Sequence, residues 1–304
     1  MKRAFPFLRG KNGELSLLFL PGFLFFLVMS YVPMVGIVIA FKDYNLRKGI
    51  FGSEWVGFDN LKFFFISDTA WRVTRNTILY SLGYIFVTLI VSLALAILLN
   101  ELTKRWIKVH QTIMFLPYFL SWVLVSYITN AFLDHQNGFL NAVLAGFGLE
   151  KIEWYFGAQY WPFILNIVHL WKAVGFSVLL YYAGIMGIDQ SYYEAARIDG
   201  ANKAQMARSI TIPLLTPLIT ILLILSIGGM FRGDFGLHYF IPNNTGLIYS
   251  STDIIDTYVF RALRTLGDIS MSAAVGLFQS IVGLVLVLLS NLLVRKINDE
   301  NSLW

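Results

Sequence analysis

The sequence has no cysteine and few charged residues. The absence of cysteine excludes disulfides, thiolate metal sites and cysteine nucleophiles. Only 13% of the 304 residues are Asp, Glu, Lys or Arg, whereas a soluble domain usually carries ~25%. The net charge is +5, and the basic residues form no dense run or stripe, so we expect no nucleic-acid partner. These absences favour a membrane protein.

Motifs of common enzyme classes are also missing. There is no Gly-x-x-x-x-Gly-Lys-Ser/Thr, so the chain is not expected to hydrolyse ATP itself. The four histidines are scattered, and together with the lack of cysteine this predicts no metal site. A Gly-x-Ser-x-Gly motif is absent as well. We therefore predict a non-enzyme that carries no cofactor of its own.

Long apolar runs dominate what is present, because 57% of the residues are hydrophobic. A transmembrane helix needs ~20 mostly apolar residues. The first run is too long for the apolar core of a signal peptide and no Ala-x-Ala pattern follows it, so we expect a retained first helix. An all-α membrane protein with about six transmembrane helices is therefore predicted, with spans at 17–41, 77–99, 112–132, 161–188, 212–230 and 269–294.

Basic residues near the span ends indicate the orientation. Placing the N-terminal tail, the connections after the second and fourth spans and the C-terminal tail inside puts both termini in the cytoplasm. The basic residues of these four segments are Lys2, Arg3, Arg9, Lys11, Lys104, Arg105, Lys108, Arg197, Lys203, Arg208, Arg295 and Lys296. The first outer loop also contains six basic residues, so charge alone gives only a modest bias.

The fourth connection, residues 189–213, has the signals of a helix–turn–helix. Ser191 and Glu194 have capping-box spacing, which predicts a helix start at Ser191. Gly200 lies where a helix commonly ends in a left-handed residue. A second short helix is predicted over 201–209, before Pro213 begins the next span. From these residues alone, a helix pair resting on lipid headgroups is an alternative.

This connection resembles the EAA loop of ABC importer permeases. The resemblance rests on Glu194-Ala195-Ala196, Asp199-Gly200-Ala201 and the ending at Ile210 to Pro213, with Ile212 where leucine is usual. Segments 31–44, 55–60, 231–236 and 286–296 further resemble permeases that take up complex polysaccharides and oligosaccharides. The resemblance extends over nearly the whole chain.

The resemblance implies a type I ABC importer permease fold, with residues 1–304 forming one transmembrane domain that has a cytoplasmic coupling helix. It implies partners: a second homologous permease subunit, two ATPase subunits that hold ATP and Mg, an extracellular solute-binding protein, an oligosaccharide substrate and membrane lipid. The residues implied to couple to the ATPase are Glu194, Ala195, Ala196, Asp199, Gly200, Ala201, Ile210 and Pro213.

Lys172 lies midway along the span at 161–188 and is a candidate for the translocation path, because an intramembrane charge usually faces a cavity or a partner. The alternatives are a structural lysine bonded to helix carbonyls and one at the permease–permease interface. The outer loop over 231–268 is expected to contact a binding protein or to shape the outer gate; the alternative is a solvated loop with some local helix.

Three functional classes remain open. The first is an ABC permease for oligosaccharides or, alternatively, for another solute. The second is an ion-coupled secondary transporter, which is disfavoured because no Asp or Glu lies in the middle of a predicted span. The third is a membrane enzyme or assembly factor, which is disfavoured because the sequence has no catalytic set.

Overall fold

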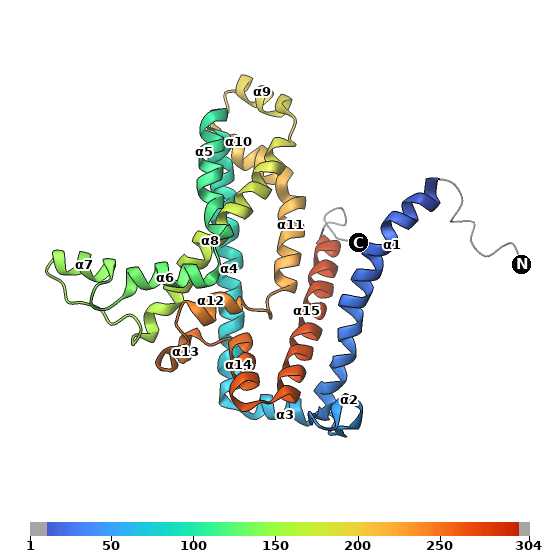
Figure 1. Cartoon of the computed structure of the whole chain (residues 1–304). Helices are drawn as coiled ribbons and strands as arrows, with labels where there is room; N and C mark the ends of the chain where they lie inside the picture. The colour runs from blue at the N-terminus through green and yellow to red at the C-terminus, as the bar shows by residue number, and fades with distance from the viewer. Residues whose placement is uncertain (1–10, 298–304) are drawn as a thin grey trace, which may run out of the picture. The chain divides into compact units, whose positions relative to one another are not determined.

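The computed structural model describes residues 11–297, which are mostly helical (Figure 1). Five helices of the described chain are long and apolar enough to cross a membrane, or up to six if one bent pair counts as a single span. This agrees with the predicted all-α membrane fold of about six spans. The predicted basic residues Lys2, Arg3 and Arg9 lie outside the described residues.

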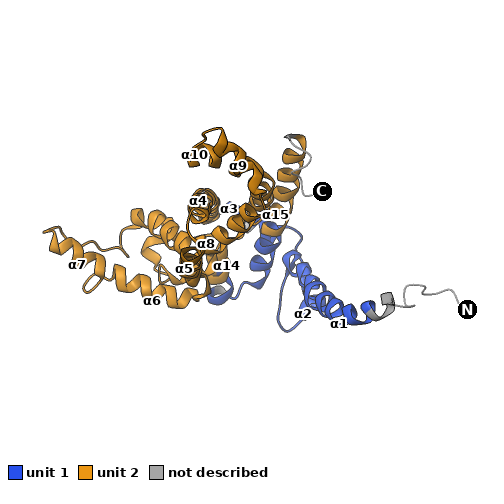
Figure 2. Ribbon diagram, turned by 90° about the horizontal axis from the view of Figure 1, so that it is seen from above, with its two compact units in different colours: residues 1–66, 262–278 blue, residues 67–261, 279–304 orange. Residues whose placement is uncertain are grey.

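The chain divides into two compact units, residues 1–66 with 262–278 and residues 67–261 with 279–304 (Figure 2). The first unit contains α1 (Lys11–Tyr31), which continues into the 3-10 helix η2 (Val32–Phe41). Together they cover the first predicted span, 17–41. Its other elements are β1 (Lys42–Asp43), α2 (Gly49–Gly52), β2 (Glu54–Trp55), α3 (Asp59–Ile66), the π-helix η7 (Ala262–Leu266) and the first part of α15 (Ile269–Ile297).

A small hairpin follows η2 in this first unit. Strand β1 pairs antiparallel with β2, with Lys42 opposite Trp55. The buried Lys42 ammonium donates to the carbonyls of Phe51 and Ser53, at 3.2 and 3.3 Å. The side-chain amide of Asn60 donates to the carbonyl of Lys42. These bonds satisfy backbone carbonyls that a two-residue strand pair leaves unpaired.

Three long helices form the centre of the second unit: α4 (Asp68–Asn100), α8 (Trp161–Met186) and α11 (Ile212–Gly228). They correspond to the predicted spans 77–99, 161–188 and 212–230, and α15 corresponds to 269–294. Helix α4 begins nine residues before its apolar run because Ser67 caps it, accepting a hydrogen bond from the Ala70 N–H.

The segment predicted as one span over 112–132 is bent instead. Helix α5 (Lys104–Phe115) continues into the 3-10 helix η3 (Leu116–Phe119), and α6 (Trp122–Leu133) follows after a turn of 102°. Pro117 is the second residue of η3, where its lack of an N–H interrupts the α-helical ladder. Ser121 then caps the new helix by accepting from the Leu124 N–H. Hydropathy alone does not reveal this break because the residues on both sides of it, 113–119 and 122–133, are mostly apolar.

Helix α6 leads into α7 (Phe139–Gly146), and the two project away from α8 as an arm (Figure 1). The 3-10 helix η4 (Ala158–Tyr160) leads back into α8. At the other end of α8 lie α9 (Gln190–Ile198) and α10 (Lys203–Met206), followed by the π-helix η5 (Ala207–Thr211).

The outer loop is folded rather than solvated over its first part. It contains α12 (Phe235–Phe240), the 3-10 helix η6 (Gly246–Ile248), α13 (Tyr249–Thr252) and α14 (Ile255–Arg261). Leu237, Ile248 and Ile254 are fully buried and pack in one cluster with Tyr84 and Trp161. Burial of this apolar surface fixes the segment against α4 and α8.

Candidate functional site

The N-cap of the first helix in the EAA-like loop lies two residues before the predicted one, Ser191. Asp189 is the N-cap of α9, and its carboxylate accepts from the Ser191 N–H at 2.9 Å. That hydrogen bond lowers the pKa of the exposed Asp189 carboxyl. The predicted capping box of Ser191 and Glu194 is therefore wrong, because both residues lie within α9 and Asp189 offers a better cap.

Gly200 ends α9 as predicted. Its φ is +79°, in the left-handed region that glycine occupies at low cost. The Ala201 N–H donates to the Ala196 carbonyl at 2.9 Å, and the Gly200 N–H donates to the Arg197 carbonyl at 3.1 Å. These two bonds form a Schellman motif, which satisfies carbonyls that a helix end leaves unpaired. A Cβ at Gly200 would meet nothing within 4 Å in this chain, so the space beside it is free.

The second helix of the loop starts at a capping box that sequence reasoning missed. The Asn202 side chain accepts from the Gln205 N–H at 2.9 Å, and the Gln205 side chain accepts from the Asn202 N–H at 2.8 Å. The predicted helix over 201–209 is thus present as α10 and part of η5. It continues without a sharp break through η5 into α11, so Lys203–Gly228 is one helical rod. Pro213 lies in the first turn of α11.

Two contacts that the sequence does not predict hold the loop to the spans. The Tyr193 hydroxyl and the Thr211 Oγ1 form a buried hydrogen bond of 2.9 Å between α9 and η5. Lys203 pairs with Glu101, at the end of α4, over 2.5 Å. The second pair is largely exposed and adds little stability. Tyr193 is the stronger anchor because its side chain is buried and its hydroxyl is satisfied.

The structure brings most of the motif residues to one place. A depression of about 320 Å³ is lined by Ala196, Asp199, Gly200, Ala201, Gln205, Met206, Ser209 and Ile210. Glu194 and Ala195 are exposed on α9 outside this depression. Ile198 is 87% exposed at the end of the helix. The loop thus presents small side chains, a hollow and one exposed isoleucine.

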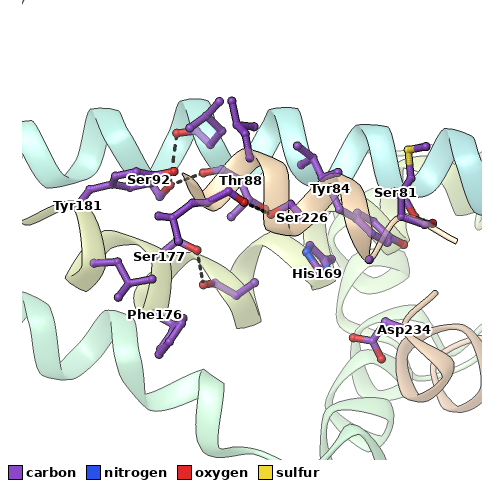
Figure 3. Close-up of a pocket in the computed structure, with 18 of the residues that line it drawn as sticks. Ser81, Tyr84, Thr88, Ser92, His169, Phe176, Ser177, Tyr181, Ser226 and Asp234 are labelled. Carbon is purple, nitrogen blue, oxygen red and sulfur yellow. Dashed lines mark hydrogen bonds between the residues drawn. The ribbon is translucent and has the colours of Figure 1, made fainter. Parts of the chain in front are cut away.

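A cavity of about 390 Å³ lies among α4, α8 and α11 (Figure 3). Its lining is rich in hydroxyl and aromatic side chains. The labelled residues are Ser81, Tyr84, Thr88 and Ser92 from α4, His169, Phe176, Ser177 and Tyr181 from α8, Ser226 from α11, and Asp234 from the segment after α11. None of these residues was predicted, because each span is too uniformly apolar for periodicity to identify a cavity face.

Two polar atoms in this cavity have no partner within residues 11–297. They are the Thr88 hydroxyl and the Nδ1 atom of His169, and both are buried. The four serine hydroxyls of the cavity donate to backbone carbonyls; Ser81, for example, donates to the Met230 carbonyl at 2.7 Å. Because a buried polar group without a partner is costly, the two atoms fit a site for a polar ligand or water.

An aromatic and histidine cluster forms one end of the cavity. The rings of Tyr84 and His169 stack, with centroids 4.0 Å apart. The Tyr84 hydroxyl contacts the Nε2 atom of His238 at 3.0 Å, and the His238 Nδ1 atom lies 2.8 Å from the Thr252 carbonyl. Burial lowers the pKa of His238 to about 4, so the ring is neutral at pH 7. Its Nδ1 then donates to Thr252, and its Nε2 accepts from Tyr84.

Lys172, the predicted path residue, lies at the bend between η3 and α6. Its ammonium donates to the Tyr118 carbonyl at 2.8 Å and lies 5.0 Å from the centroid of the Trp122 ring. One turn along α8, Gly175 has no room for a Cβ, which would clash with the Met114 carbonyl. These contacts hold the end of α5–η3 against α8. A lysine bonded to a helix carbonyl is the structural alternative given above for Lys172. Its role in the translocation path stays a prediction.

Metal ligands do not gather in the described part of the chain. Residues 11–297 contain no group of three or more His, Cys, Asp or Glu side chains that could hold an ion.

Comparison with known proteins identifies the family. Residues 89–299 match the family described as binding-protein-dependent transport system inner membrane component. The chain is 38% identical over 287 residues to Protein LplB of Bacillus subtilis (strain 168), covering 94% of this chain and 90% of that one. It is 37% identical to the polygalacturonan/rhamnogalacturonan transport system permease protein YteP of the same organism, with coverage of 94% and 89%.

Solved structures agree with the sequence relatives. A chain of a bacterial ABC transporter involved in the import of the acidic polysaccharide alginate superposes with a TM-score of 0.86 at 30% identity, covering 95% of this chain and 97% of that one. A chain of a bacterial alginate ABC transporter in complex with an alginate pentasaccharide-bound periplasmic protein gives a TM-score of 0.85 at 30% identity, with coverage of 94% and 96%. The fold is therefore that of an ABC importer permease, which leaves ATP hydrolysis to a separate chain, and this multi-pass membrane protein belongs to the family of binding-protein-dependent transport system inner membrane components.

Proposed function

We propose that this chain is one permease subunit of an ATP-driven importer that carries oligosaccharides or polysaccharide fragments across the cytoplasmic membrane. The observation that carries the proposal is the cavity among α4, α8 and α11, with its hydroxyl and aromatic lining. Sugar hydroxyls need polar partners and sugar rings pack on aromatic faces. Thr88 and His169 offer unpaired polar atoms for the first requirement, and Tyr84 and Phe176 offer rings for the second.

The relatives support the choice of substrate class. YteP is described as a polygalacturonan/rhamnogalacturonan permease, and the structural neighbours belong to an importer of alginate. A third relative, the arabinooligosaccharide permease AraP of Halalkalibacterium halodurans, is 25% identical over 92% of this chain. All three substrates are built from linked sugar rings. We propose the same general class here, and the test below includes both acidic and neutral members.

The EAA-like loop is proposed to dock on the ATPase. Its support is the combination of the motif, the Schellman end at Gly200 and the continuous rod from Lys203 to Gly228. A docked loop that moves with the ATPase would carry α11, which lines the cavity, so closure of the ATPase pair would reshape the path. In this role, Gly200 and Ala201 give close approach, Asp199 and Ile210 border the depression, and Glu194 and Ala195 face outward.

The remaining partners and the orientation belong to the same proposal. They are a second homologous permease, two ATPase subunits that bind ATP and Mg, and a solute-binding protein on the outer side. One structural neighbour comes from a transporter in complex with a periplasmic binding protein, which favours the last of these. With six spans, both termini lie on the loop side of the membrane, which is the cytoplasm if the loop meets the ATPase.

Uptake into proteoliposomes tests the function. The chain is reconstituted with its second permease, the ATPases and the binding protein, and labelled galacturonate, alginate and arabinose oligosaccharides are offered with internal ATP. We expect import of at least one series that requires ATP. Import that persists without the ATPases and follows an ion gradient would instead support a secondary transporter.

A pair of variants connects the result to the cavity. Thr88→Val removes the unpaired hydroxyl while keeping the side-chain shape, and we expect a several-fold lower uptake with an unchanged amount of complex. Thr216→Val is the matched control, because the exposed Thr216 on α11 bonds only the Ile212 carbonyl. Equal uptake by the two variants would contradict a substrate path through this cavity.

A further inference from the structure

A second cavity, of about 480 Å³, lies between α6 and α12, outside the one described above. Helix α6 contributes one face of residues spaced three or four apart. The lining residues are Val123, Ser126, Tyr127 and Asn130 from α6, and Tyr239, Phe240, Asn243 and Asn244 from α12 and the turn after it. We refer to this set as the arm cavity. It has no acidic or basic side chain, which disfavours an ion or a charged peptide as its ligand.

Several polar groups that line the arm cavity form no hydrogen bond with other described residues. The Tyr127 hydroxyl and the side-chain amides of Asn130 and Asn243 have no hydrogen-bond partner among residues 11–297, and all three residues are exposed. Exposed polar groups of this kind are not expected against lipid tails, where each unsatisfied group costs several kcal/mol. The arm cavity therefore faces water or a polar ligand.

The turn that carries the two asparagines is held in an uncommon conformation. Asn243 and Asn244 have φ values of 53° and 47°, a left-handed pair that asparagine tolerates better than most residues. The Asn244 side-chain oxygen accepts from the Tyr249 hydroxyl at 2.7 Å. This bond holds the turn through Asn244, while the Asn243 amide has no hydrogen-bond partner among the described residues.

A buried charge pair supports this arrangement. The Arg261 guanidinium lies 4.1 Å from the centroid of the Tyr249 ring and pairs with Asp253 at 2.6 Å. The Asp253 side chain is fully buried, so this pair anchors the segment firmly. Tyr239 is held as well, because its ring stacks on Phe235 with centroids 5.0 Å apart. A rigid lining lowers the entropy lost when a ligand binds.

The arm cavity lies on the side of the molecule away from the EAA-like loop. Helix α10 and η5 precede α11, whereas α12 follows its far end, and Figure 1 shows α9 and α12 near opposite ends of α11. If the loop is cytoplasmic, α12 lies toward the outer side. A substrate arriving from outside would pass this cavity before the one among α4, α8 and α11.

We infer that the arm cavity binds a stretch of the oligosaccharide on the outer side of the translocation path. This inference rests on the proposed function and deepens it, because a second contact would favour longer chains over short ones. Phenol and amide groups without charge suit sugar hydroxyls and ring faces. Tyr127 would pack against a ring, and Asn130 and Asn243 would bond its hydroxyls.

A thiol-protection experiment tests this binding in the complete transporter with its loaded binding protein. The chain has no cysteine, so Asn130→Cys gives a unique thiol on it. The matched control is Asn137→Cys, an exposed asparagine of the same arm outside the cavity. The probes are neutral arabinose oligosaccharides of two and six residues, and labelling by a polar maleimide is read on this chain by mass spectrometry.

We expect the hexasaccharide to slow labelling of Asn130→Cys several-fold, the disaccharide to have little effect, and neither to protect Asn137→Cys. In transport, Tyr127→Ala should raise KM for the hexasaccharide about 3- to 10-fold, as expected for loss of a ring contact, and leave the disaccharide unchanged. Import of the hexasaccharide without protection of Asn130→Cys would overturn this inference alone.

Two further outcomes would also overturn it. If the Asn130→Cys thiol is unreactive in the assembled transporter even without sugar, the second permease covers the arm cavity and no saccharide binds there. If the wild-type complex imports neither probe, the proposed substrate fails and this inference fails with it. The two failures are distinguished by the transport of wild type.

Discussion

The EAA-like loop and the outer segment over 235–261 are both short helices joined by turns, yet they are held in opposite ways. The loop depends mainly on neighbours in sequence: its longest internal hydrogen bond among the described residues, Tyr193 to Thr211, spans 18 residues, and its long-range ion pair, Lys203 with Glu101, is largely exposed. The outer segment depends on distant residues, since Tyr84 and His238 are 154 residues apart and Asn76 reaches Asp253 over 177. We therefore expect the loop to keep its shape while the spans move. The conformation of the outer segment, in contrast, depends on how the spans pack.

The largest effect that would sharpen this comparison is expected at Gly200. Gly200→Asp adds a charged side chain at φ +79°, where the structure itself has open space. The chain should therefore still fold and insert, whereas association with the ATPase and uptake should fall by about tenfold or more. Copurification of the ATPase subunits measures the association, and a transport assay measures the uptake. Gly200→Asn is the control, with the same backbone cost of roughly 1 kcal/mol but no charge. Normal uptake by Gly200→Asp would contradict docking at this turn.

A smaller effect is expected at Lys172. Lys172→Met keeps the aliphatic stem but loses the bond to the Tyr118 carbonyl, which we expect to destabilise the bend at α6 by about 1–2 kcal/mol. Melting of the purified complex in detergent measures this loss, and Lys172→Arg, which keeps a donor, should recover most of it.

Transport decides between the two roles of this lysine. Uptake reduced far more than stability in Lys172→Met would favour the translocation path. Loss of assembled complex in proportion to lost stability would favour the structural role.

The pH dependence of stability tests the outer segment. Because the pKa of His238 is about 4 in the folded chain and 6.5 is its ordinary value, the unfolded chain binds the proton first as pH falls. His238 therefore favours the fold above pH ~6.5, and this contribution is lost progressively down to pH ~4. Melting temperatures from pH 8 to 4.5 check the direction. His238→Gln should reduce the slope, and His110→Gln, at an exposed histidine of α5, should not.

The smallest effect is expected at Tyr193. Tyr193→Phe removes the hydroxyl that bonds Thr211 but keeps the buried ring, at a cost of about 1 kcal/mol. We expect uptake to fall less than twofold, because the Schellman and capping-box bonds still hold the loop. Amide hydrogen exchange over 190–211 is the measurement. Faster exchange confined to this loop is expected; a simultaneous increase in the outer segment would show that the two regions are not independent.

The same contrast explains what the sequence predicted. The sequence predicted the spans from the length of the apolar runs, the turn from Gly200 and the family from a motif of fixed spacing. All three are local signals. The start of α9 was misplaced because Ser191 and Glu194 had the right spacing while Asp189 had the better position. Three features could not be predicted from the sequence: the bend after Pro117, the cavity lining and the contact of Tyr84 with His238. They depend on which helices pack together, and a uniformly apolar run carries no local signal of its packing partners.

The unbroken rod from Lys203 to Gly228 has a mechanical consequence. Its 26 residues span ~39 Å, so a tilt of about 10° at one end displaces the other by ~7 Å. Such a rod acts as a lever, and the displacement of its far end is proportional to its length. Shortening it by a turn would reduce the stroke, and a softer joint at η5 would absorb the force before it reached the sugar.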